Sequence, residues 1–112
     1  MKTKVGDYLR FKGYTGTVEP IFVPGDVVVV VSIHHDIEGN PGYVVALCKD
    51  TLLTPHQVHA CSLDTYIEDL LFDGEFTYLS KERAKKEARM QEAACRAGLF
   101  RRHVQGWDLR TA

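Results

Sequence analysis

The stretch GDVVVVVSI, residues 25–33, decides the fold because it places five valines in a row. Valine is branched at Cβ and fits the pleated surface of a sheet, and an unbroken run of it favours burial on both faces. We therefore predict a central strand over residues 26–33. Residues 36–42 are dense in turn formers. A second strand over residues 43–48 is thus expected to return antiparallel to the first.

Weaker signals of secondary structure lie on both sides of this hairpin. Residues 8–12 alternate between apolar and polar side chains and predict a strand. Residues 57–61 are predicted as a short fourth strand and residues 75–79 as a last strand. Residues 64–72 carry apolar side chains at helical spacing and predict a short helix. The core expected from these patterns is Leu9, Phe11, Val28, Val30, Tyr43, Val45, Leu47 and Val58.

Two of the expected strands open with a Gly-Asp pair, in the stretches GDYL at residues 6–9 and GDVV at residues 25–28. These openings look like the Gly-Asp-x-Val openings common in SH3-like and KOW-type barrels. The resemblance, together with the order of strands and loops, implies a mainly β protein with an SH3-like small β-barrel over about residues 5–63. This barrel would lie within a body of residues 1–79.

The C-terminal third differs from the body in charge. Residues 1–79 carry five basic and eleven acidic side chains, a net charge of −6, whereas residues 80–112 carry nine and four, a net charge of +5. A helix over residues 81–97 is predicted, with Ser80 as its N-cap and Gly98 just past its end. Because its apolar side holds mainly alanine, we expect this helix to be only lightly anchored on the barrel.

The segment after this helix combines aromatic residues with arginines and contains the only tryptophan. Such side chains are enriched among the residues that dominate protein interfaces. We therefore predict that Phe100 and Trp107 are buried in a functional assembly and that Arg101 and Arg102 pair with carboxylates or phosphates. The alternative is that Trp107 caps the protein's own barrel. A partner protein or self-association is expected. The general pattern, a small barrel with a charged helical extension and without an enzymatic motif, is similar to small bacteriophage accessory proteins.

Nucleic-acid binding is the alternative function, because small barrels can offer aromatic side chains for stacking and basic ones for phosphates. Its candidates are Tyr8, Arg10, Lys12, Tyr14, Lys85 and Arg89. The acidic body and a pI of about 6.5 speak against it, since nucleic-acid-binding domains usually carry a strong basic excess. A non-enzymatic binding or adaptor protein is therefore the favoured function.

Enzymatic and metal-dependent functions find little support. The sequence has no phosphate-binding glycine loop, no nucleophile motif and no zinc-protease motif. A metal could be held by Cys48, His59 and Cys61, but paired Cys-x-x-Cys spacing is missing and core or solvated roles are favoured. We expect no cofactor and no small-molecule substrate. The odd number of cysteines and the absence of a signal or membrane-length apolar stretch predict a cytoplasmic protein, of the host cytoplasm if viral.

Overall fold

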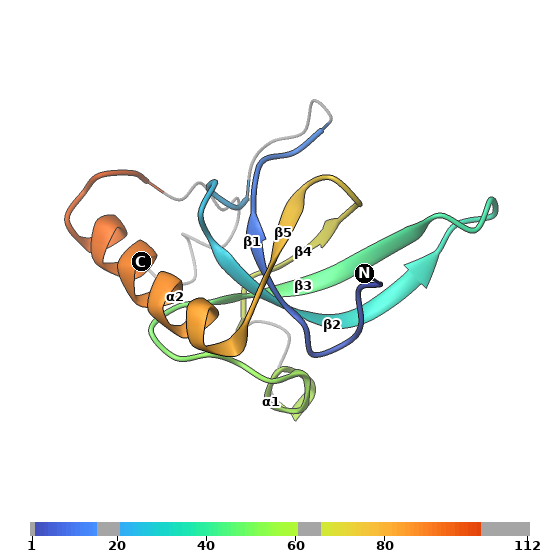
Figure 1. Ribbon diagram of the computed structural model, residues 1–112, viewed down its shortest axis with the longest axis horizontal. Helices are drawn as coiled ribbons and strands as arrows, with labels where there is room; N and C mark the ends of the chain where they lie inside the picture. Colours follow the sequence, from blue (N-terminus) through green and yellow to red (C-terminus); the bar gives the residue numbers. More distant parts are fainter. Residues whose placement is uncertain (1, 16–20, 61–65, 102–112) are drawn as a thin grey trace.

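The computed structural model describes residues 2–15, 21–60 and 66–101 (Figure 1). They form one antiparallel sheet with the strand order β4-β3-β2-β1-β5, together with a short and a long helix. In chain order the elements are β1 (Tyr8–Phe11), β2 (Val27–His35), β3 (Pro41–Cys48), α1 (Pro55–Ala60), β4 (Glu68–Leu71), β5 (Phe76–Leu79) and α2 (Lys81–Arg96). The prediction of a mainly β protein with a C-terminal helix is confirmed.

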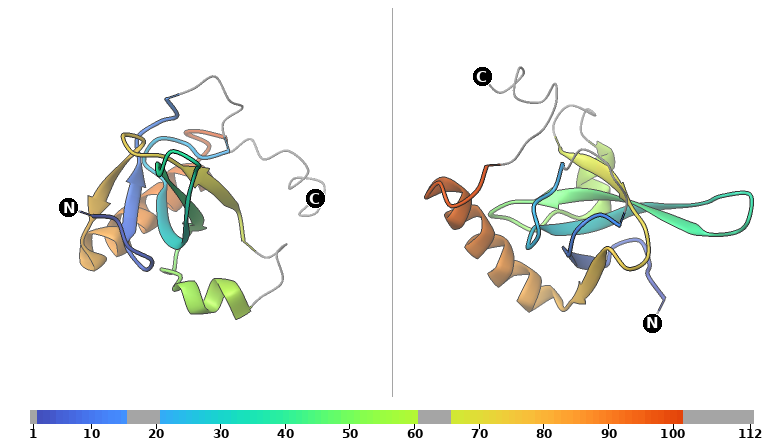
Figure 2. Two further views of the ribbon diagram at one scale, coloured as in Figure 1. Left: turned by 90° about the vertical axis from the view of Figure 1, so that its right-hand side faces the viewer. Right: turned by 90° about the horizontal axis from the view of Figure 1, so that it is seen from above.

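The sheet curls strongly, yet its hydrogen-bonded ladder stays open. β4 and β5 form its opposite edges but are separated along the chain only by residues 72–75, so the edges must approach one another. Figure 2 shows this curl from two further sides. Among the described residues, ladder hydrogen bonds join β4 to β3 and β5 to β1, and not β4 to β5. A closed barrel is therefore not confirmed, and the sheet uses two strands beyond residue 63, the expected limit of the barrel.

The valine run contributes to two cores, one on each face of the sheet. The first core consists of Leu9, Phe11, Phe22, Val28, Val30, Tyr43, Val45, Leu47, Ile67 and Leu71. The second consists of Val27, Val29, Val31, Ala46, Cys48, Val58, Ala84 and Ala88. All five valines are almost fully buried, which confirms the predicted burial on both faces. All eight predicted core residues are buried as well, although Val58 belongs to the second core.

Helix α2 covers the second core and is more firmly seated than the sequence indicates. Ser80 caps its first turn by accepting a hydrogen bond from the Arg83 backbone N–H, as predicted. Ala84 and Ala88 are 0% and 1% exposed, and the helix contacts β1, β2 and β5. The expectation of a lightly anchored helix considered the alanine stripe alone, whereas hydrogen bonds and ion pairs of Glu87, Gln91 and Arg96 also join the helix to the body. Ala84 and Ala88 add dispersion contacts with the valine face of the sheet.

The predicted strand at residues 57–61 is instead part of α1, with Cys61 outside the described residues. A capping box begins this helix. The Thr54 hydroxyl accepts from the Gln57 backbone N–H at 3.2 Å, and the Gln57 side chain accepts from the Thr54 N–H at 2.9 Å. Pro55 occupies the first helical position, where its missing N–H costs nothing. These local signals outweigh the apparent alternation of apolar and polar residues.

The predicted helix at residues 64–72 is also wrong over its described part, because Glu68–Leu71 forms strand β4. β4 pairs antiparallel with β3, and the Leu47 backbone N–H donates to the Ile67 carbonyl just before the strand begins. The backbone N–H and C=O groups on the outer side of β3 need hydrogen-bond partners. Because the sequence of this segment suits a helix and a strand equally, pairing with β3 decides in favour of the strand.

Three turns of the chain share one hydrogen-bonding pattern, at residues 4–7, 23–26 and 72–75. In each turn the fourth residue is Asp or Glu, and its carboxylate accepts from the backbone N–H of the first residue at 2.7–2.8 Å. The N–H of the fourth residue donates to the carbonyl of the first, and the third residue is a glycine with φ between +92° and +101°. The Gly-Asp openings are thus explained by turn chemistry.

Replacing Gly25 with alanine is expected to destabilise the protein more than replacing Gly6. Both glycines have the same backbone conformation, which costs an alanine about 1–2 kcal/mol. A Cβ at Gly6 would meet nothing within 4 Å, whereas one at Gly25 would lie 3.0 Å from Gln91 Oε1 of α2. Urea denaturation of the two variants measures the difference. Equal losses of unfolding free energy in the two variants would show that Gln91 of α2 does not restrict the space at Gly25.

Candidate functional site

An ion pair joins α2 to the first strand. The Arg10 guanidinium donates two hydrogen bonds of 2.6 Å to the Glu87 carboxylate, and Arg83 adds a third of 2.8 Å from within the helix. The hydrogen bond from Arg10 is the main reason why the pKa of Glu87 lies below its usual value. This paired geometry fixes the rotation of α2 above the sheet.

Removing the charge of Glu87 is expected to weaken the fold in a pH-dependent way. Glu87→Gln should cost about 1 kcal/mol at pH 7, because Arg10 then loses a partly buried partner. The folded-state pKa of Glu87 is lowered, so its stabilisation is present above the unfolded-state pKa and disappears as the pH falls through the folded-state value. Urea denaturation over a series of pH values should therefore show the full difference between the variant and wild type at pH 7 and a smaller one as the pH falls below the unfolded-state pKa. Glu82→Gln, on the exposed side of the same helix, is the control.

Two further contacts fix the C-terminal half of α2. Gln91 Nε2 donates to Oδ1 of the fully buried Asp26 at 3.0 Å. Arg96 Nη2 lies 2.5 Å from Asp50 Oδ2 in the loop after β3. With the ion pair of Glu87, these contacts join the helix to the body from its middle to its C-terminal end.

The end of α2 has the geometry of a Schellman motif. The Gly98 N–H donates to the Cys95 carbonyl and the Leu99 N–H to the Ala94 carbonyl, both at 3.0 Å, and Gly98 has a φ of +78° as predicted for this position. Leu99 is nevertheless 77% exposed. The chain therefore leaves a fixed helix end with an apolar side chain in solvent.

Of the four residues predicted to bind a partner, two are described. Phe100 is half-buried and Arg101 is exposed, directly after the helix end. Arg102 and Trp107 lie outside the described residues. The term C-terminal arm is used below for Leu99–Arg101 and all residues after them.

The aromatic candidates for nucleic-acid binding, Tyr8 and Tyr14, form hydrogen bonds within the fold and do not share one exposed surface. The Tyr8 hydroxyl donates to the Leu53 carbonyl at 2.9 Å, and Tyr8 packs against the second core. The Tyr14 hydroxyl donates to Asp69 Oδ2 at 2.7 Å, and its ring lies 4.6 Å from that of Phe11 in the first core. Burial and then Asp69 raise the pKa of Tyr14. The two tyrosines thus belong to opposite faces of the sheet.

The basic candidates divide in the same way. Arg10 is bound to Glu87, as described above, whereas Lys12, Lys85 and Arg89 are exposed. Lys85 and Arg89 stand one helical turn apart on α2, so only these two of the predicted residues are neighbours on one exposed face.

The residues proposed to hold a metal do not form a cluster in the described part of the chain. Cys48 is buried in the second core, where its sulfur accepts from the Leu53 N–H, and burial raises the pKa of this thiol to about 11. His59 is exposed and its Nε2 lies 3.1 Å from the Val31 carbonyl oxygen. Cys61 lies outside the described residues. Cys48 is thus a core residue, and its protonated thiol is a poor metal ligand.

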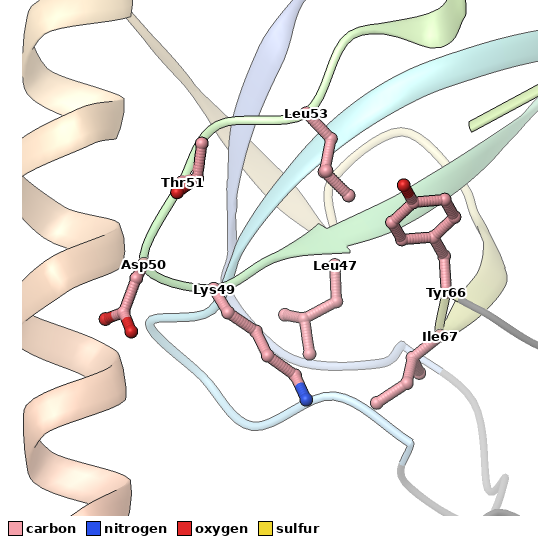
Figure 3. Close-up of a pocket in the computed structure, with 7 residues that line it drawn as sticks. All are labelled: Leu47, Lys49, Asp50, Thr51, Leu53, Tyr66 and Ile67. Carbon is pink, nitrogen blue, oxygen red and sulfur yellow. The ribbon is translucent and has the colours of Figure 1, made fainter. Parts of the chain in front are cut away.

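Two surface features were not predicted. A pocket of about 310 Å³ opens between the loop after β3 and the start of β4, lined by Leu47, Lys49, Asp50, Thr51, Leu53, Tyr66 and Ile67 (Figure 3). At the other end of β3, Ile37 is fully exposed at the tip of the β2–β3 hairpin. The signal for the second feature was present in the sequence, because isoleucine is unusual among the turn formers of residues 36–42.

Comparison of the chain with protein-family models, curated proteins and solved structures finds no match. Neither α1 nor α2, the helices of the described ranges, combines the length and the apolar composition that crossing a membrane requires. The function must therefore be argued from the surfaces themselves.

Proposed function

We propose that the protein is a non-enzymatic binding module of the cytoplasm that holds a protein partner with its C-terminal arm. The observation that carries this proposal is the exposure of Leu99, 77%, directly beyond a helix end that is fixed by its hydrogen bonds. An apolar side chain in that position loses little conformational freedom when a partner covers it. Phe100 and Arg101 follow it and are residue types that contribute strongly to protein interfaces.

The body acts as the base for this arm. The ties of α2 to Arg10, Asp26 and Asp50 mean that the arm starts from a defined place on the sheet. We also propose that the curled sheet is an open relative of the SH3-like barrel, in which the short link over residues 72–75 brings the two edges together. The five antiparallel strands and their strong curl support this assignment.

Nucleic-acid binding remains the second candidate, supported by the exposed pair Lys85 and Arg89 on the outer face of α2. The other predicted residues favour it less, since Tyr8, Arg10 and Tyr14 are engaged within the fold. The two candidate functions use different surfaces, so variants can separate them.

The test is a capture experiment from extract of the native host with three forms of the full chain. The arm variant carries Phe100→Ala and Arg101→Glu, and the helix variant carries Lys85→Glu and Arg89→Glu. We expect wild type and the helix variant to retain the same protein after nuclease treatment and up to about 200 mM salt, while the arm variant loses it. Capture that nuclease or salt abolishes, or that only the helix variant loses, would contradict the arm proposal and favour nucleic acid.

A further inference from the structure

The β2–β3 hairpin carries one exposed apolar side chain, Ile37, on a hydrogen-bonded tip. In Figures 1 and 2 it projects well beyond the rest of the sheet. The Asp36 carboxylate accepts from the backbone N–H groups of Glu38 and Asn40 at 2.9 and 2.8 Å, and the Asp36 N–H donates to the Asn40 carbonyl. Ile37 is held within this closed loop with its side chain in solvent. A tip so organised would lose little entropy on entering a pocket.

The pocket in Figure 3 has the complementary chemistry. Its lining is largely apolar, with Leu47, Leu53 and Ile67 arranged around the same opening as the ring of Tyr66. Its rim carries one cation and one anion, Lys49 and Asp50. Asp50 forms an ion pair with Arg96, outside the pocket, so that Lys49 supplies the charge that is available to a ligand. Such a pocket suits a branched apolar side chain next to a carboxylate.

We infer that this pocket receives Ile37 of a second copy of the chain, with Glu38 of that copy beside Lys49. The volume of about 310 Å³ accommodates an isoleucine side chain. The sequence around the tip places acidic residues on both sides of the isoleucine, which matches the cation at the rim. This contact is separate from the C-terminal arm and does not depend on the function proposed for it.

The charge match between the tip and the pocket rim points to another copy of the same tip as the occupant, and the chain's own tip cannot reach the pocket. The tip precedes Pro41 and the pocket loop follows Cys48, so the length of β3 separates them. Eight residues of a strand span about 25 Å. A contact between two different patches closes into a dimer where two copies exchange it about a two-fold axis, and it builds an open chain or a ring where they do not.

Because one side chain anchors this contact, we expect weak association that is detectable only at high protein concentration. Sedimentation equilibrium of the full chain at up to about 1 mM should show species larger than the monomer. Ile37→Ser should weaken association at least about tenfold, since it removes the apolar anchor. The arm variant, with Phe100→Ala and Arg101→Glu, should associate like wild type, which separates this inference from the function proposed above.

A charge exchange gives the decisive result. Lys49 and Glu38 are both exposed, so Lys49→Glu and Glu38→Lys are not expected to disturb folding. Each variant alone should associate several-fold more weakly than wild type, because like charges meet at its contact. An equimolar mixture should recover the association of wild type, since every tip then meets a pocket of opposite charge. Wild type that stays monomeric at 1 mM, Ile37→Ser that associates like wild type, or a mixture no stronger than its components would each overturn the inference.

Discussion

Phe11→Ala is expected to lower the free energy of unfolding by about 3–5 kcal/mol. Phe11 is 1% exposed and lies in the first core. Its ring packs at 4.6 Å from Tyr14 and 5.8 Å from Phe22, so its removal leaves a cavity lined by aromatic side chains. Urea denaturation followed by circular dichroism measures the loss.

Phe72→Ala is the matched control for this prediction. Phe72 is 48% exposed and stands outside both cores, so the same chemical change should cost well below half as much. Comparable losses in the two variants would mean that the first core is not organised around Phe11.

The second large effect is expected for Ala88→Glu, which should destabilise the protein by about 3 kcal/mol or more. Ala88 is 1% exposed between α2 and the valine face. A carboxylate there would be removed from water without a partner, or would force the helix away from the sheet. Thermal and urea denaturation both report the change.

Ala93→Glu tests the same substitution on the exposed side of the same helix. It should change the unfolding free energy by no more than about 0.5 kcal/mol. If Ala88→Glu were tolerated as well as Ala93→Glu, α2 would not be part of the packed fold.

The strands of the fold could be predicted where composition and pattern agree. The valine run and its return strand are confirmed, as are the first and last strands and the caps of α2. The presence of two cores follows from the same run, because consecutive residues of a strand point to opposite faces. The pattern does not predict that α2 covers the second core. The helix does so with Ala84 and Ala88, whose small side chains give only a weak hydrophobic signal.

The errors have two different causes. At α1 the sequence contains a local signal for a helix, the capping box of Thr54 and Gln57, which the alternation over residues 57–61 obscures. At β4 no local signal distinguishes a helix from a strand, because residues 66–72 suit both. Only the pairing with the edge of β3 in the folded sheet favours the strand. The pocket by Lys49 was not predictable for a similar reason, as it joins the ends of two strands that pair only in the folded sheet.

The central claim is that α2 belongs to the fold whereas the C-terminal arm belongs to a partner. Thermal unfolding of the chain ending at Gly98, measured beside the full chain together with capture of the partner, tests it most directly. We predict a melting temperature within about 2 °C of that of the full chain, because the contacts of Glu87, Gln91 and Arg96 with the sheet and the loop after β3 all lie before Gly98. We also predict complete loss of the partner. A fall of about 4–8 °C, as for 1 kcal/mol of lost packing in a domain of this size, would place the arm in the protein's own core and contradict the account.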